Sequence, residues 1–247
     1  SRADPQREAS TNTFARSFVA KLLWLSRTVR PDLAYTVSVL CSRLQTWDGE
    51  CTDQLVQALG YVKNTLDHGV ILKSKIDDDL ESARWTSYSD SDWSRPSQTG
   101  ICAGLTTKSS NFIPIKWKSQ AQPITADSPT CARWIALHES IKEMVPWTMS
   151  IPCIKDKRLL AYCDNLPTVR SCHKGYSKRT AALERAMGTR LDVICDMIKG
   201  DIVELGHVPG KINPADIQTK MLLKVSLRSN KELHKIGPIS TEQNKHS

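Results

Sequence analysis

Hydrophobic residues recur with helical spacing through the first part of the chain. Three stretches, 13–27, 31–45 and about 51–66, place an apolar residue at every third or fourth position. In the first of them one helical face collects Phe14, Phe18, Leu22 and Leu25. A short apolar run, "GVILK", follows and is typical of a strand. This pattern predicts a small helical unit over residues 1–72.

The pattern changes after a charged stretch at 73–83, which we interpret as a linker. Beyond it, five β-prone runs predict strands: "RWTSYSD", "TGICAGLTT", "NFIPIKWKS", "RLLAYCD" and "DIVELGHV". Helices are expected from Ser128, over 176–199 and from Asn213, with Ser128 and Asn213 as N-caps before proline. Three antiparallel strands followed by strand–helix alternation predict an α/β domain with a mixed five-stranded sheet flanked by helices.

Composition and charge bear on the class of partner. The 247 residues carry a net charge of +8, which favours a polyanion such as nucleic acid, although an evenly spread solubility charge would give the same total. No apolar run approaches the roughly 18 residues that span a membrane, so no membrane partner is expected. The eight cysteines form no C-x-x-C pair, so a zinc site is not expected and the thiols indicate a reducing compartment.

The polar N-terminus lacks an initial Met and the features of a signal peptide. We therefore expect a piece of a longer chain that is intracellular, cytoplasmic or nuclear, and not secreted.

Five blocks occur in a characteristic order: "YSDSDW", "IKWKSQAQP", "SPTCARWIALHES", "AYCDN" and "HVPGKINPADIQTK". In this order they resemble the ribonuclease H domain of Ty1/copia-type retrotransposon polyproteins. Upstream, "LLWLSRTVRPDLAYTVSVLCSRL" resembles the end of the reverse transcriptase in the same polyproteins. The resemblance implies a ribonuclease H-like domain at 84–222 and a loose tail at 223–247. It also implies an RNA–DNA hybrid and the upstream reverse transcriptase segment as partners.

The chemistry implied by this resemblance needs four carboxylates around two divalent metal ions, Mg²⁺ or Mn²⁺. Asp90, Asp164 and Asp216 fall on the first, third and fourth family positions, so they are the candidate catalytic residues and metal ligands. Asp92 stands two residues beyond the first of them, and we interpret it as a turn or solvent residue.

The second family carboxylate is missing. Arg133 takes its place, and Cys131 takes the place of another family glutamate nearby. Guanidinium groups neither ligate metals nor lose their proton at physiological pH. Glu139 lies about 240° further around the helix, and Asp127 precedes the helix, so neither replaces the lost acid. We expect Arg133 to point towards the aspartates, to form an ion pair with Asp90 or Asp164, and to weaken Mg²⁺ binding.

The functional hypothesis is therefore a degenerate ribonuclease H-like domain, ancestrally hydrolysing the RNA of RNA–DNA hybrids, with poor or absent cleavage here. Three alternatives remain open: an active ribonuclease H that tolerates Arg133, a non-catalytic nucleic-acid-binding domain, and a relic without a biochemical role. Candidate phosphate contacts, each of which could equally belong to a solvated face, are Lys116, Lys118, Lys178, Arg179, Arg185 and Arg190. We interpret His207, at a strand end, as a structural histidine.

Overall fold

The computed structural model of the chain describes residues 5–72, 80–109, 111–175, 192–220 and 236–238. The chain divides into two compact units, Ser1–Ile71 with Met221–Ser247, and Leu72–Lys220. The predicted linker at 73–83 lies largely outside the described residues, as does the predicted loose tail at 223–247 apart from one short strand. The predicted domain boundaries therefore remain a prediction.

The first unit is built from helices. They are α1 (Pro5–Thr28), the 3₁₀ turn η1 (Pro31–Leu33), α2 (Ala34–Ser42) and α3 (Gly49–Lys63). Their apolar faces meet in a core that includes Val19, Leu22, Val37, Leu40 and Leu55. The short strand β1 (His68–Val70) pairs antiparallel with β7 (Ile236–Pro238), so the C-terminal part of the chain completes a ribbon begun before the second unit.

A buried ion pair holds the first unit together. Arg30 Nε donates to Asp32 Oδ1 at 3.0 Å, and its Nη2 donates to Asp32 Oδ2 at 3.0 Å. Tyr61, on α3, donates its hydroxyl to the same carboxylate at 2.5 Å, and Arg30 Nη1 donates to the Thr65 carbonyl at 3.0 Å. Burial lowers the pKa of Arg30, but the hydrogen bond and charge of Asp32 outweigh that effect and raise it. The network connects the η1 turn that precedes α2 to the end of α3.

The second unit is a five-stranded mixed sheet. Its strands are β2 (Arg84–Ser91), β3 (Gln98–Thr106), β4 (Phe112–Ala121), β5 (Leu159–Cys163) and β6 (Val203–His207), in the order β4-β3-β2-β5-β6. The pairs β2–β3 and β3–β4 are antiparallel, whereas β2–β5 and β5–β6 are parallel. The predicted α/β fold with a mixed five-stranded sheet is confirmed.

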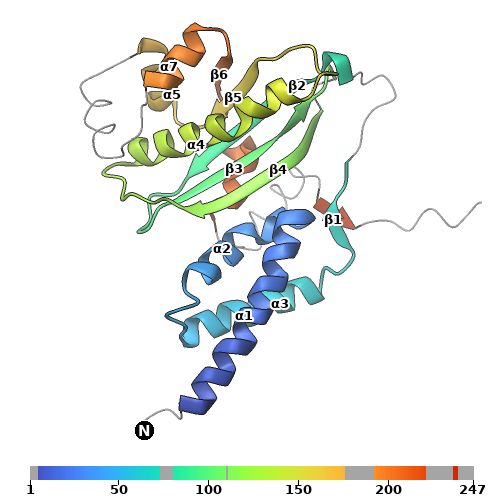
Figure 1. The fold of residues 1–247 in the computed structure, drawn as a ribbon, viewed down its shortest axis with the longest axis vertical. Helices are drawn as coiled ribbons and strands as arrows, with labels where there is room; N and C mark the ends of the chain where they lie inside the picture. Colours follow the sequence, from blue (N-terminus) through green and yellow to red (C-terminus); the bar gives the residue numbers. More distant parts are fainter. Residues whose placement is uncertain (1–4, 73–79, 110, 176–191, 221–235, 239–247) are drawn as a thin grey trace, which may run out of the picture. The chain divides into compact units, whose positions relative to one another are not determined.

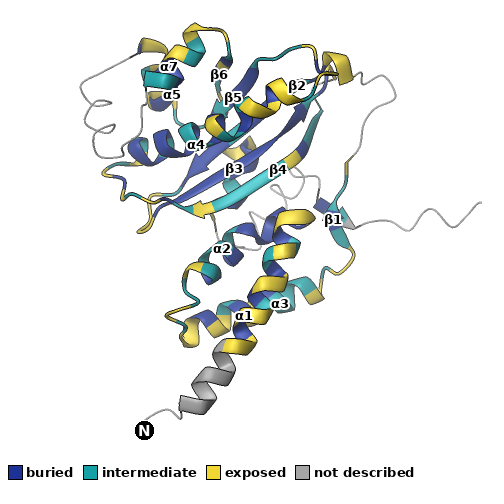
Figure 2. Ribbon diagram, in the orientation of Figure 1, coloured by how far each residue is buried: buried dark blue, intermediate teal, exposed yellow. Residues whose placement is uncertain are grey.

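Helices flank this sheet. They are α4 (Pro129–Ser150), α5 (Leu166–Lys174) and α7 (Asp192–Lys199), with 3₁₀ turns η2 (Leu80–Ser82), η3 (Gly210–Ile212) and η4 (Pro214–Gln218). Helix α4 runs across one face of the sheet (Figure 1) and buries Leu137, Ile141 and Met144 against Trp85 and Leu159. Figure 2 shows β2 and β3 buried along most of their length. The expected N-cap is confirmed, since the Ser128 hydroxyl accepts from the Cys131 amide at 3.2 Å.

One helix prediction needs correction, and one helix was not predicted. The segment predicted as a closing α-helix from Asn213 is instead the 3₁₀ turn η4, although its N-cap is confirmed: Asn213 Oδ1 accepts from the Ala215 amide. The Asn213 side-chain amide also donates to the Ser89 carbonyl at 3.1 Å, which fixes this turn against β2. Helix α5 was not predicted, and of the helix expected over 176–199 the described part is α7.

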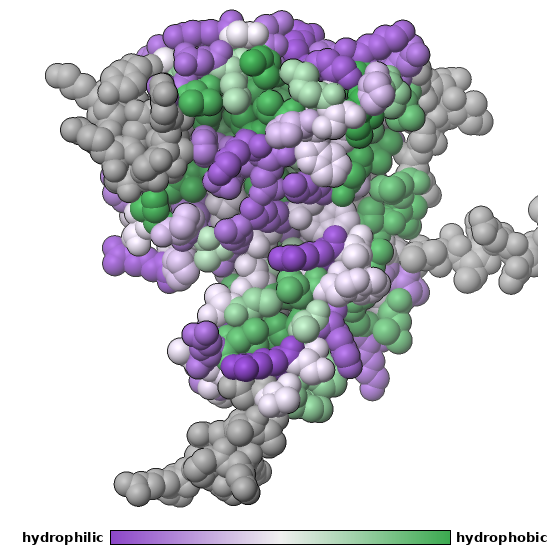
Figure 3. All heavy atoms as spheres, in the orientation of Figure 1, coloured by the Kyte–Doolittle hydropathy of each residue, from purple (hydrophilic) through white to green (hydrophobic). Residues whose placement is uncertain are grey.

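None of the described helices combines the length and apolarity that a membrane crossing demands. In the view of Figure 3, hydrophilic and hydrophobic side chains are interspersed over the described surface.

Candidate active site

Asp90 lies near the C-terminal end of the central strand β2. Its side chain is buried, with 4% exposed, and its Oδ2 accepts a hydrogen bond of 2.6 Å from the Thr219 hydroxyl. Burial raises the pKa of Asp90, and the negative charge of Asp164 raises it further. A buried carboxylate beside another carboxylate requires nearby positive charge to stay ionised.

Asp164 follows β5, the parallel neighbour of β2. Parallel strands end at the same edge of a sheet, so the two aspartates meet there. His207, at the end of the next parallel strand, donates its Nε2 to the Asp164 carbonyl oxygen at 3.1 Å. This hydrogen bond holds the backbone of Asp164 in place, which agrees with the interpretation of His207 as a structural histidine.

Asp216 enters from η4. The turn brings its charge close enough to disfavour ionisation of Asp90, and its carboxylate forms an ion pair with Lys220 one turn later. The Thr219 hydroxyl, which donates to Asp90, also lies 3.1 Å from the Asp216 carbonyl oxygen. The structure thus brings the three predicted aspartates to one place.

Arg133 projects from the second turn of α4 into this acidic group. Its Nε donates to Asp164 Oδ1 at 2.9 Å, and its Nη2 lies 3.9 Å from Asp90 Oδ1. Burial lowers the pKa of Arg133, but the hydrogen bond to Asp164 and the charges of both aspartates outweigh this and raise it. The guanidinium is therefore a permanent cation, and the expected ion pairing is confirmed with both aspartates.

A divalent metal implied by this fold does not fit the side chains as they stand. Hard cations such as Mg²⁺ are held by carboxylate oxygens, and here one oxygen of Asp164 is already committed to a guanidinium. Among the described residues, no group of three His, Cys, Asp or Glu side chains is arranged to hold a metal ion. The positive charge of Arg133 would also repel a metal ion bound beside it.

Asp92, unlike Asp90, forms hydrogen bonds with the residues that follow it in the chain. Its Oδ1 accepts from the Gln98 amide at 2.5 Å, and its Oδ2 accepts from the Ser94 hydroxyl at 2.7 Å. These bonds close the loop between β2 and β3. The interpretation of Asp92 as a turn residue is confirmed.

Gly100 permits the close approach of η4 to the sheet. A Cβ atom at this position would lie 2.7 Å from the Ala215 carbonyl oxygen and 2.7 Å from Thr219 Cγ2. Both contacts are far inside van der Waals distance, and one of them is backbone. The glycine thereby lets the Thr219 hydroxyl reach Asp90.

We expect Gly100→Ala to destabilise the second unit by about 1–3 kcal/mol, because η4 must move away from β3. Urea unfolding followed by circular dichroism would measure this change. Gly60→Ala is the matched control, since a Cβ there meets nothing within 4 Å inside α3. That substitution should stabilise the chain by up to about 1 kcal/mol. Equal effects at the two positions would contradict the close-approach explanation.

The predicted nucleic-acid-binding residues fall into two groups. Lys116 and Lys118, on β4, both form ion pairs with Glu143 of α4. Burial raises the pKa of Glu143, but its hydrogen bonds to the two lysines outweigh burial and lower it. Their intramolecular partner reduces the charge they offer to phosphate, and their binding role stays a prediction. The others lie outside the described residues: Lys178, Arg179, Arg185 and Arg190.

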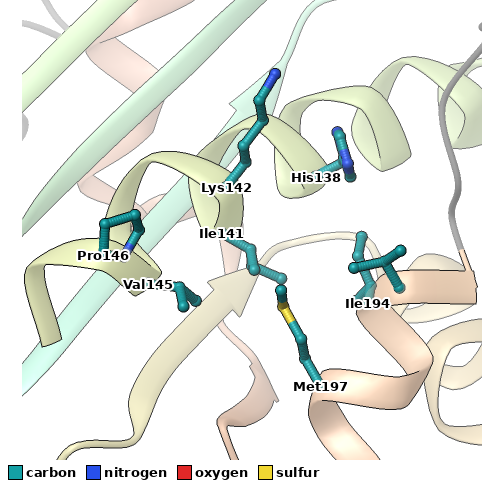
Figure 4. A pocket seen from close by; sticks show the side chains of 8 residues that line it. His138, Ile141, Lys142, Val145, Pro146, Ile194 and Met197 are labelled. Atoms are coloured by element: carbon teal, nitrogen blue, oxygen red, sulfur yellow. The ribbon is translucent and has the colours of Figure 1, made fainter. Parts of the chain in front are cut away.

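A small pocket of about 200 Å³ lies between α4 and α7. Figure 4 shows Ile141 and Met197 pointing towards each other across it, with Val145, Pro146 and Ile194 nearby. Its lining holds none of the three aspartates, so it is separate from the candidate site.

Sequence reasoning missed Thr219 and Lys220, which contact Asp90 and Asp216. The spacing of Lys220, four residues after Asp216 in "DIQTK", carried a signal for the ion pair. A hydroxyl donor such as Thr219 carries no comparable pattern, because its partner is 129 residues away.

Comparisons with known proteins find retrovirus-related Pol polyproteins among the relatives of this chain. The chain is 26% identical over 220 residues to the retrovirus-related Pol polyprotein from transposon RE2 of Arabidopsis thaliana, covering 87% of this chain and 14% of that protein. It is 28% identical over 228 residues to the corresponding polyprotein from transposon TNT 1-94 of Nicotiana tabacum, covering 88% and 16%. The resemblance to retrotransposon polyproteins is thus confirmed over most of the chain.

An uncharacterized mitochondrial protein of Arabidopsis thaliana is 31% identical over 134 residues, covering 52% of this chain and 51% of that protein. The chain spans between 14% and 51% of the length of these three relatives. No protein-family model matches it.

Among solved structures, the foamy viral protease-reverse transcriptase in complex with RNA/DNA hybrid matches with a TM-score of 0.52 and 11% identity. The match covers 87% of this chain and 26% of that protein. LC11-RNase H1 in complex with RNA/DNA hybrid gives a TM-score of 0.39 at 17% identity, over 54% of this chain and 91% of that protein.

Proposed function

We propose that this chain, a relative of the retrovirus-related Pol polyproteins of plant transposons, holds RNA–DNA hybrids in a ribonuclease H-like domain that cleaves them poorly or not at all. The observation that carries this proposal is Arg133, whose guanidinium lies 2.9 Å from Asp164 and 3.9 Å from Asp90. It occupies the position at which the resemblance expects a catalytic glutamate.

The chemistry of the site supports loss of cleavage more than loss of binding. Two-metal hydrolysis of a phosphodiester requires free carboxylate oxygens to hold Mg²⁺ or Mn²⁺. Asp90, Asp164 and Asp216 are retained, but Arg133 forms ion pairs with the first two and Lys220 forms an ion pair with the third. These internal ion pairs compete with metal binding, and the guanidinium adds a positive charge where the metals would otherwise sit.

Net charge and a structural neighbour support a nucleic-acid partner. The chain carries a net charge of +8, and the solved reverse transcriptase that shares its fold was bound to an RNA/DNA hybrid. Positive charge in the place of a catalytic acid removes one source of repulsion for a phosphate backbone. Binding without efficient hydrolysis therefore follows from the same substitution.

The native chain is expected to bind a short RNA–DNA hybrid without sequence preference and to leave it uncut in Mg²⁺. Affinity should fall steeply as salt rises, because neutralised phosphates release their counterions. Fluorescence anisotropy at several salt concentrations measures binding, and a labelled RNA strand on a denaturing gel measures cleavage.

Asp90→Asn is the control for cleavage. Hybrid hydrolysis by the native chain that Asp90→Asn abolishes would instead identify an active ribonuclease H. Absence of binding even at low salt would point to a relic. Each alternative hypothesis therefore has its own result.

A further inference from the structure

Trp93 presents a large aromatic ring to solvent beside the candidate site. The residue is 57% exposed, although it follows a buried strand and stands three residues after Asp90. Tryptophan is highly buried on average in folded proteins, so an exposed indole next to a site needs a reason.

The ring is held in place. Its Nε1 donates to the Ala126 carbonyl oxygen at 3.2 Å, which ties the end of β2 to the segment that leads into α4. Because this hydrogen bond uses the polar atom of the indole, the ring offers its apolar faces to a ligand. An anchored side chain loses little conformational entropy when it binds.

The loop that carries Trp93 is also well ordered by hydrogen bonds. Asp92 closes the turn through Gln98 and Ser94, and the Ser97 hydroxyl donates to the Ser94 carbonyl at 3.0 Å. The Ser97 carbonyl accepts from the Gln122 amide at 2.7 Å. The side chain of Gln122 in turn reaches α4 through the Ala132 carbonyl, one residue before Arg133.

Trp93 and the acidic group therefore belong to the same edge of the second unit. The indole is anchored to the approach of α4, and Arg133 extends from the second turn of that helix to Asp90 and Asp164. A nucleic-acid strand whose phosphate lies at the aspartates would pass this edge.

We propose that Trp93 is a nucleotide-binding residue, whose indole packs against a base or sugar of the strand held at the acidic group. This inference rests on the proposed hybrid binding and adds the residue that provides its apolar contact. Stacking on an aromatic ring tolerates any sequence, because every base has a π-face. The contact contributes affinity without neutralising a phosphate.

The test compares native chain, Trp93→Ala and Trp93→Phe on an RNA–DNA hybrid and on the single RNA strand, each containing 2-aminopurine. Trp93→Ala should bind on the order of 5- to 100-fold more weakly, and Trp93→Phe should stay within about threefold of native. Plots of affinity against salt should keep the native slope, since no phosphate contact is lost. Quenching of 2-aminopurine should diminish in Trp93→Ala.

Trp24→Ala is the matched control, because Trp24 on α1 is 65% exposed and lies in the other unit. Trp93→Leu, which keeps the apolar bulk and removes the aromatic faces, replaces the alanine variant if that variant melts below the assay temperature. Greater loss on the single strand assigns the ring to an unpaired base, and equal loss assigns it to the paired strand.

Native binding with unchanged affinity in Trp93→Ala and Trp93→Leu overturns the role of Trp93 and leaves the proposed function intact. The same holds if Trp24→Ala loses as much affinity as Trp93→Ala. No binding by the native chain overturns both.

Discussion

Replacing Arg133 with glutamate is expected to make the melting temperature of the chain depend on Mg²⁺. In the native chain the guanidinium already forms ion pairs with both Asp90 and Asp164 and competes with a metal ion for them, so added Mg²⁺ should change the melting temperature little. With glutamate at 133, four acids face one another, and a bound cation relieves their repulsion. At 100 times its Kd, Mg²⁺ would stabilise the variant by about 2.7 kcal/mol, a rise of roughly 5–10 °C for a chain of this size.

Differential scanning fluorimetry in EDTA and in Mg²⁺ measures this effect. Arg133→Met removes the charge without adding a ligand, and it separates relief of competition from the gain of a carboxylate. Asp90→Asn combined with Arg133→Glu should cancel the Mg²⁺ response and any hybrid cleavage that the glutamate restores. A native chain that Mg²⁺ stabilises as strongly as Arg133→Glu would refute the account of Arg133 as a fixed counterion.

Asp32→Ala is expected to destabilise the first unit by about 3–5 kcal/mol. The substitution leaves the Arg30 guanidinium buried without its partner and removes the acceptor of the Tyr61 hydroxyl. Both charged side chains are almost fully buried, at 3% and 0% exposed, so solvent screens their interaction weakly. Urea unfolding monitored by circular dichroism of the helices gives the free energy.

The double variant Arg30→Met, Asp32→Ala should lose less stability than the two single losses added together, because no charge remains unpaired. Glu50→Ala serves as the surface control. Its ion pair with Arg43 is exposed, and its removal should leave the unfolding midpoint nearly unchanged. Strictly additive single losses would show that the pair is not energetically coupled.

The spacing of apolar residues predicted most of the helices and strands. Residues on the buried face of a helix or strand recur with the period of that element. The β-prone run "RWTSYSD" and the apolar run "RLLAYCD" became β2 and β5, and Ser128 began α4 as expected. Helix α5 was missed because its nine residues, "LPTVRSCHK", are too short and polar for a clear period. The Asn165 cap before a proline was the available signal.

The candidate site was predictable in its acids and in Arg133, since the ordered motifs aligned them. Its supporting contacts were not, because they join distant segments. Thr219 reaches Asp90 only because Gly100 lets η4 approach the sheet, and Lys118 finds Glu143 across 25 residues. Local sequence encodes where an element begins, whereas such pairings depend on how elements pack.

Strand β7 makes the first unit discontinuous along the chain. Residues Leu72–Lys220 are, in sequence terms, an insertion between β1 and β7, which pair with each other. Two peptide connections therefore join the units, and a single proteolytic cut in one of them leaves the other intact. Trimming the C-terminus past Ile236 would leave β1 as an unpaired edge, so its backbone groups would turn to water or to another strand. Loss of β7 would thus remove a pairing from the same unit that contains α1, α2 and α3.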